Sequence, residues 1–274
     1  MAAPPPPGVS VQPGQKDPLA FRANYNDIKY RLLGAGTRTK NFPRLKTGNA
    51  SVDDAIGGFP NGLTVLFGDP GGGKSKMAKW VAETVAKASK RKPLVLVSED
   101  VFDAPSTELC NVADYAAYQP RWEAAIDEAK CFLKNLNPPI VVIDSATTFL
   151  SNTSKAVEEA DVRSGLWEIS AIARAANIPV IAVSQIRGEG YSLRAAGGRA
   201  VEHAGAMCIR FDRVECLSSW TAKRYNASEG DVVWSMVVTK DKHGLAHQGS
   251  LHRVIYNSDG PTLERVKYRE APNK

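Results

Sequence analysis

The sequence predicts an α/β fold: a mostly parallel, twisted sheet flanked by helices and extended by antiparallel strands near the C-terminus. Three observations favour this class. Between Gly62 and Val183, short apolar runs rich in β-branched residues alternate with longer amphipathic segments, as in strands joined by crossover helices. A glycine-rich loop separates the first run from the first amphipathic segment. After Gly205, apolar runs follow one another without a helical pattern between them.

The pattern assigns each element in turn. Helices are expected at residues 75–89, 121–135 and 157–176, and the strands that alternate with them at 63–67, 94–97, 140–143 and 179–183. The third helix has one buried face, because its apolar residues recur at steps of three and four, at Val162, Leu166, Ile169 and Ala173. Further strands are expected at residues 207–211, 232–238, 251–256 and 263–266. We predict no helices between these last strands.

The flanking segments differ in composition from the predicted core, which spans residues 46–268. Residues 1–20 are rich in Pro, Gly, Gln and Ala and cannot bury enough apolar surface to offset chain entropy, which predicts a disordered arm. Residues 21–45 form a basic lead-in, either a structured entry to the core or a basic contact strip. Residues 269–274 are expected to be a short tail.

Bulk composition excludes several classes of protein. Lys and Arg exceed Asp and Glu by 35 to 29, which allows an anionic partner without identifying one. The four cysteines are widely spaced and form no Cys-x-x-Cys pair, so neither a zinc site nor a redox dithiol is indicated. No stretch approaches the roughly 18 apolar residues of a membrane span, and the N-terminus lacks the apolar core of a signal peptide. We expect a cytoplasmic protein, in the host cytoplasm if it is viral, with no membrane partner.

The glycine-rich loop reads Gly-Asp-Pro-Gly-Gly-Gly-Lys-Ser at residues 68–75. Its glycines let successive backbone N–H groups point inward, and the helix that follows adds the positive end of its dipole, so a nucleoside triphosphate is the natural ligand. Lys74 is expected to reach the β- and γ-phosphates of ATP and the Ser75 hydroxyl to ligate Mg²⁺. The expected nucleotide-binding residues are Gly68, Asp69, Pro70, Gly71, Gly72, Gly73, Lys74, Ser75 and Lys76.

Polar residues end three further strands. Asp144 closes the run Ile140 to Ile143 and is expected to hold a water of the Mg²⁺ shell. Glu99, with Asp100 as the alternative, is expected to polarise the attacking water, although simple capping of the next segment is another interpretation. Gln185 is expected to hydrogen-bond the γ-phosphate or the attacking water and so to sense whether that phosphate is present.

Taken together, these motifs resemble the RecA superfamily of P-loop ATPases over residues 45 to about 268. The segment from Leu45 to Gly58 is similar to the Thr-Gly, Leu-Asp and Gly-Gly lead-in of RadA, KaiC and archaeal recombinases. Gly68-Asp69-Pro70-Gly71 is similar to the bacterial RadA loop, and Ser184-Gln185-Ile186-Arg187 to the strand end in RecA and DnaB. The segment from Gly197 to His203 is similar to the end of a recombinase DNA-binding loop. The resemblance implies a RecA-like core without further domains, as in phage-encoded recombination ATPases.

The resemblance also implies where single-stranded DNA binds. The stretch from Arg187 to Gly198 corresponds to the second DNA-binding loop, and the candidate DNA-binding residues are Arg187, Tyr191, Arg194 and Arg199. Arginines that neutralise phosphates beside an aromatic ring on which a base can stack are the ingredients of single-strand binding. An ordinary loop with solvated arginines is the alternative. Residues 152–161, which include Lys155, would correspond to the first DNA-binding loop.

The segment from Val238 to Gly244 resembles the Lys-x-Lys of RecA and the Lys-x-Arg of DnaB-type helicases. The resemblance implies that Lys240 and Lys242 neutralise charge on the γ-phosphate in a neighbouring subunit, which requires a homo-oligomer, either a filament or a hexameric ring. An exposed turn with two solvated lysines is the alternative. The sequence departs from the family at Lys76, where a second Ser or Thr is usual.

Three functions are compatible with these motifs. The first is a single-stranded-DNA-binding ATPase of DNA recombination, repair or replication, with DNA-stimulated hydrolysis of ATP at subunit interfaces. The second is a hexameric DnaB-like helicase or nucleic-acid translocase. The third is a KaiC-like regulatory ATPase with protein partners, which the basic charge balance disfavours.

Overall fold

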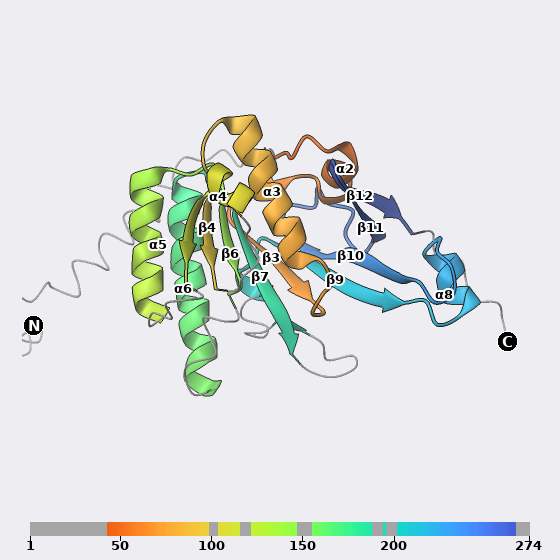
Figure 1. The fold of residues 1–274 in the computed structure, drawn as a ribbon. Helices are drawn as coiled ribbons and strands as arrows, with labels where there is room; N and C mark the ends of the chain where they lie inside the picture. The colour runs from red at the N-terminus through yellow and green to blue at the C-terminus, as the bar shows by residue number, and fades with distance from the viewer. Residues whose placement is uncertain are drawn as a thin grey trace, which may run out of the picture. The chain divides into compact units, whose positions relative to one another are not determined.

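The fold was analysed in a computed structural model that describes residues 43–98, 104–115, 122–146, 155–187, 194–195 and 202–266 (Figure 1). Among these residues, no helix is long and apolar enough to cross a membrane. The elements in chain order are β1 (Arg44–Leu45), α2 (Ala50–Ile56), β2 (Phe59–Pro60), β3 (Leu63–Gly68), α3 (Lys74–Ser89), β4 (Leu94–Val97), α4 (Ala104–Leu109), β5 (Asn111–Asp114), α5 (Trp122–Leu136), β6 (Val141–Asp144), α6 (Lys155–Ala175), β7 (Val180–Arg187), β8 (Arg194–Ala195), β9 (Met207–Glu215), α8 (Ser219–Arg224), β10 (Val232–Asp241), β11 (Leu251–Asn257) and β12 (Gly260–Arg265).

The sheet runs in the order β12-β11-β10-β9-β3-β7-β6-β4-β5, with β8 paired to β7. The strands from β9 to β5 in this order are mutually parallel, while β10, β11 and β12 follow β9 as antiparallel neighbours. The predicted α/β class and its antiparallel extension are therefore confirmed. The first strand of the C-terminal group, β9, is itself parallel to β3 and joins the two parts of the sheet.

The predicted helices and strands are present within a few residues of their expected bounds. The prediction of no helix among the C-terminal strands was wrong, because α8 connects β9 to β10. This helix has only six residues, and its first turn is closed by the Ser218 side chain, which accepts a hydrogen bond from the Thr221 N–H. A single capped turn and a half leaves no apolar periodicity to detect. Short elements at β1, α2, β2, α4, β5 and β8 were also not predicted.

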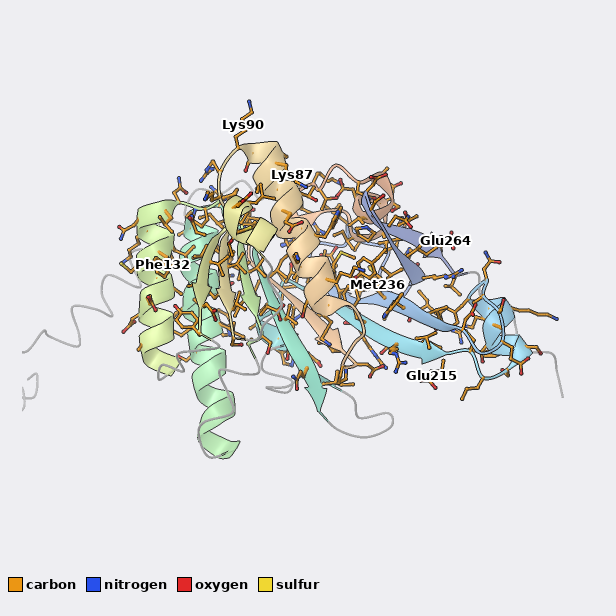
Figure 2. All side chains as sticks on the ribbon, in the orientation of Figure 1. Lys87, Lys90, Phe132, Glu215, Met236 and Glu264 are labelled. Atoms are coloured by element: carbon orange, nitrogen blue, oxygen red, sulfur yellow. The ribbon has the colours of Figure 1, made fainter. Side chains whose placement is uncertain are left out.

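Two apolar layers cover the sheet, because side chains alternate between its faces. On one face α3 packs Met77, Ala78 and Val81 against strand residues that include Met236 of β10. On the other face α5 and α6 cover β3, β4, β6 and β7, and Phe132 of α5 packs at the margin of this layer. Figure 2 labels one residue of each layer, Met236 and Phe132.

The Thr-Gly lead-in forms a capped helix that docks on β12. Asn49 caps α2 by accepting from the Val52 N–H, and its amide donates to the Pro261 carbonyl oxygen at 3.0 Å. The Asp53 carboxylate accepts hydrogen bonds from the N–H groups of Thr47 and Gly48. The lead-in residues therefore fix the chain just before β3 enters the sheet.

Candidate nucleotide-binding site

The glycine-rich loop follows β3 at the carboxyl edge of the parallel strands. Gly68 has φ of 141°, and a Cβ atom there would lie 1.7 Å from the Phe211 carbonyl oxygen of β9. The next residue, Asp69, donates its N–H to the same oxygen at 3.0 Å. Only glycine allows this approach, so the loop starts from a fixed point on β9.

The loop ends at the first turn of α3. Gly73 caps this helix in the left-handed region, at φ of 92°, and no side chain caps the helix. The backbone N–H groups of a helix N-terminus and the helix dipole favour an anion at this position. The loop therefore leads directly into a helix N-terminus, and its binding of phosphate stays a prediction.

Lys74, the first residue of α3, is largely buried and its side chain reaches back to the start of the loop. Its Nζ donates to the carbonyl oxygens of Gly68 at 3.0 Å and Asp69 at 2.6 Å. These contacts hold the ammonium beside the helix N-terminus, where it adds positive charge to the cradle.

Ser75 and Asp144 meet although they come from different elements. The Ser75 hydroxyl, on α3, donates to Asp144 Oδ1 at 3.2 Å, and Asp144 is fully buried at the end of β6. A hydroxyl and a carboxylate at this spacing supply hard oxygen donors, which suit Mg²⁺ that keeps waters and binds phosphate oxygens. The residues present therefore fit a Mg²⁺-nucleotide.

The neighbouring strand end is tied to Asp144. The Ser98 N–H donates to the Asp144 carbonyl oxygen at 2.7 Å, and the Ser98 hydroxyl accepts from the Ser145 N–H at 2.9 Å. The Asp144–Ser145 peptide bond is cis. Glu99 and Asp100 follow Ser98 directly but lie outside the described residues. Gln185 lies on β7 in register with Gly68 and is exposed.

The structure adds residues that sequence reasoning missed. Trp234 of β10 donates its indole N–H to the Gly71 carbonyl oxygen at 2.9 Å, and the Tyr256 hydroxyl of β11 donates to the Gly73 carbonyl oxygen at 2.7 Å. Lys76, expected to bind nucleotide, places its Nζ 4.5 Å from the centre of the Tyr256 ring. No sequence signal marks these aromatic residues, because they lie in ordinary strands far along the chain.

Sequence reasoning also missed an ion pair on β9, the strand that contacts the loop. Arg210 Nε donates to Asp212 Oδ1 at 2.7 Å, and Asp69 accepts from the Arg213 N–H at 3.3 Å. Burial raises the pKa of the Asp212 carboxyl, although the Arg210 guanidinium opposes the shift. The β9 strand thus supports the loop with backbone contacts and carries its own ion pair nearby.

Lys240 and Lys242 lie toward the amino end of β3, whereas the phosphate loop follows the carboxyl end of that strand. Lys240 pairs with Cys208, which pairs with Val65 of β3, and the Lys242 N–H donates to the Ala206 carbonyl oxygen. The Nζ atoms of both lysines donate to the His203 carbonyl oxygen, at 3.3 Å and 3.2 Å. Lys242 also lines a cavity of about 310 Å³ together with Arg174 and His243. Burial, followed by the nearby Lys240 and Arg174, lowers the Lys242 pKa.

The candidate DNA-binding residues are described only in part. Arg187 and Arg194 are backbone partners in the antiparallel pairing of β7 with β8. Their side chains, and the whole of Tyr191 and Arg199, lie outside the described residues. Of the first candidate DNA-binding loop, the backbone from Lys155 onward belongs to α6.

The chain is similar in sequence to DNA repair proteins named RadA. No family model matches the chain. It is 29% identical over 179 residues to the DNA repair protein RadA of Chlamydia pneumoniae, covering 63% of this chain and 38% of that protein. It is 27% identical over 187 residues to RadA of Mycobacterium tuberculosis, covering 64% and 36%. The chain thus matches well under half the length of these relatives.

A solved structure shares the fold. A KaiC-like protein from the archaeon Pyrococcus horikoshii superposes with a TM-score of 0.63 at 17% identity, covering 82% of this chain and all of that one. The likeness extends the match beyond the phosphate loop to most of the sheet. The chain is thus similar in sequence to part of RadA and shares its fold with a KaiC-like protein.

Proposed function

We propose that the chain is an ATPase that binds single-stranded DNA and acts in DNA recombination, repair or replication in the cytoplasm. The observation that carries the ATPase half is the Ser75–Asp144 contact behind a glycine cradle that also holds Lys74. The RadA relatives, each named a DNA repair protein, and the formal charge of +6 support the DNA half.

The candidate site residues have separate tasks in such a reaction. The loop N–H groups and the Lys74 ammonium bind the β- and γ-phosphates and stabilise charge that grows during phosphoryl transfer. Ser75 and Asp144 would hold Mg²⁺, which neutralises the phosphate oxygens when bound. Glu99 would orient and polarise the attacking water, and Gln185 would sense the γ-phosphate from the strand beside the loop.

We further propose that Lys240 and Lys242 act on the nucleotide of a neighbouring copy. Through Cys208, Lys240 is level with Val65, three residues before Gly68, which is about 10 Å along the strand at roughly 3.3 Å per residue. Lys242 lies further from the loop still, because Ala206, its partner, also donates to the Leu63 carbonyl oxygen. Both lysines therefore lie toward the opposite end of the strands from the phosphate loop of their own chain. This separation supports an action on the nucleotide of another subunit.

Mixing two inactive variants tests the intersubunit site. Lys74→Ala removes the loop lysine, while Lys240→Ala with Lys242→Ala removes the pair. In a mixed oligomer, Lys74→Ala subunits supply intact lysines to the intact loops of the other variant. We expect ATP hydrolysis by the mixture to exceed that of either variant alone. In a control mixture, a chain that carries all three substitutions takes the place of Lys74→Ala, so that no subunit supplies intact lysines. Equal, negligible rates in both mixtures would contradict the intersubunit arrangement.

The DNA half has its own test. Replacing Arg187, Tyr191 and Arg194 by alanine should weaken binding of a fluorescent single-stranded oligonucleotide at least tenfold and abolish its stimulation of ATP hydrolysis, because phosphate contacts and stacking are lost together. Unchanged binding would exclude this loop. If the wild type hydrolyses ATP but binds no polynucleotide at low salt, the KaiC-like alternative with protein partners replaces the DNA proposal. Directional strand unwinding by a closed ring would favour the helicase alternative.

A further inference from the structure

The outer side of the phosphate loop is held by two aromatic residues from the C-terminal strands, Trp234 and Tyr256, which we call the aromatic clamp. Trp234 donates to the Gly71 carbonyl oxygen at 2.9 Å and Tyr256 to the Gly73 carbonyl oxygen at 2.7 Å. The two rings contact each other edge to face, with centroids 6.2 Å apart and an interplanar angle of 76°. The clamp therefore binds two peptide groups of one short loop as a unit.

The direction of these carbonyls determines the direction of the neighbouring N–H groups. In a trans peptide the C=O of one residue and the N–H of the next point to opposite sides. The Gly73 oxygen accepts from both the Tyr256 hydroxyl and the Met77 N–H, so the Lys74 N–H points away from these donors, in the first turn of α3, where an anion would bind. Holding the Gly71 oxygen likewise turns the Gly72 N–H inward, where it donates to the Asp69 carbonyl oxygen at 3.0 Å.

The fit between the loop and the clamp is close. A Cβ atom on Gly73 would lie 2.9 Å from the Tyr256 hydroxyl oxygen, and the Gly73 φ of 92° independently favours glycine. Burial raises the pKa of the Tyr256 phenol, so the hydroxyl remains a donor at neutral pH. Any movement of Gly73 must therefore break the Tyr256 hydrogen bond or displace the ring.

Lys76, at the position where the sequence departs from the pattern that it resembles, also contacts the Tyr256 ring. A cation in the first turn of a helix is opposed by the helix dipole. The Lys76 ammonium lies over the Tyr256 ring, 4.5 Å from its centre, where the negative face of the ring attracts it. The residue that replaces a hydroxyl in the motif thus packs on the same ring that binds the loop.

We propose that Tyr256 and Trp234 are positioning residues, which orient the peptide groups of the phosphate loop for the triphosphate and thereby set nucleotide affinity. This inference rests on the proposed nucleotide-binding function. It does not require either residue to touch the nucleotide.

Conservative variants test the clamp. Tyr256→Phe and Trp234→Phe each remove one donor but keep an aromatic ring. We expect each to raise the Kd for MgATP and for MgADP, measured by calorimetry, about three- to tenfold, the range for one lost hydrogen bond. The double variant should depart from additivity because the rings touch. Binding of ATP should change the tryptophan emission of the wild type but not that of Trp234→Phe, since Trp234 reports the loop.

Matched controls separate positioning from general destabilisation. Tyr115→Phe removes a tyrosine hydrogen bond of the same length, 2.7 Å to Glu128, on the α5 side of the sheet. Trp220→Phe changes an exposed tryptophan on α8. Both should bind ATP as the wild type does. Equal affinities in all variants, or an equal loss in Tyr115→Phe and Tyr256→Phe, would overturn the proposal. If the wild type binds no ATP, the proposed function itself fails instead.

Discussion

Arg44 and Asp241, 197 residues apart in the chain, form a buried ion pair with an Nη2–Oδ1 distance of 2.6 Å. Arg44 also donates to the carbonyl oxygens of Ile56 and Gly58, and Asp241 accepts from the N–H groups of His243, Leu245 and Ala246. Asp241 lies between Lys240, in β10, and Lys242, in the turn that follows, so this ion pair fixes the segment that carries both lysines.

Asp241→Asn should destabilise the protein by about 3–5 kcal/mol, because it leaves the Arg44 charge buried without its partner. Burial alone would raise the Asp241 pKa, but the hydrogen bonds from Ala246 and His243 and the Arg44 guanidinium hold it below its usual value. A lowered folded-state pKa gives stability that is complete above the unfolded value, near pH 4, and is lost as the pH falls through the folded one.

Urea unfolding at pH 7 and at pH 3 measures both effects. The difference in unfolding free energy between the wild type and Asp241→Asn should be largest at pH 7 and smaller at pH 3. Arg44→Met, which removes the cation, should destabilise at pH 7 as well. A difference that grows as the pH falls would contradict the assigned direction of the pKa shift.

Asp144→Asn and Ser75→Ala should each raise the Mg²⁺ concentration that ATP hydrolysis requires. Removing an oxygen that holds or orients the metal shell typically lowers metal affinity by about 10- to 100-fold. The measurement is the Mg²⁺ concentration that gives half-maximal hydrolysis. Asp114→Asn is the matched control, since this carboxylate ends β5 and pairs with Val97 as Asp144 does, but on the opposite side of β4. An equal shift in all three variants would remove the metal assignment.

Gly68→Ala should prevent stable folding of the loop region, because the new methyl group would overlap the Phe211 carbonyl oxygen at 1.7 Å. Gly230→Ala is the control for backbone conformation alone. Gly230 has φ of 91°, and nothing lies within 4 Å of its added Cβ atom. We expect a loss of about 1–2 kcal/mol at Gly230, from the left-handed backbone, and a clearly larger fall in Tm at Gly68. Similar values of Tm would mean that β3 and β9 separate easily.

Cys131 should be the thiol that reacts rapidly with a disulfide reagent at pH 8. It is exposed, whereas Cys110, Cys208 and Cys216 are buried. Burial raises the pKa of Cys110 and of Cys208 to about 11, so few thiolates form there. Cys131→Ser should abolish the fast phase, and guanidinium should expose the remaining thiols. More than one fast thiol in the folded wild type would contradict the burial of these side chains.

The sequence by itself determined the phosphate loop, the main strands and helices, and the expectation that Ser75 and Asp144 serve one Mg²⁺ site. These are local signals: glycines at fixed spacing, apolar periodicity, and the rule that parallel strands deliver their carboxyl ends to one edge. Glu99 and the candidate DNA-binding side chains remain predictions. The departure at Lys76 could be seen in the sequence, but its partner could not.

Only the tertiary structure decided which distant residues support the loop and the lysine turn. Trp234 and Tyr256 lie 163 and 183 residues from the glycines they bind, and Arg44 lies 197 residues from Asp241. Each of these residues lies in a strand. The apolar pattern of a strand indicates which side chains are buried, but it does not indicate which other strands lie beside it. Strand order and register bring β9, β10 and β11 beside β3, and pairing across a sheet depends on the packing of the whole chain rather than on any local sequence.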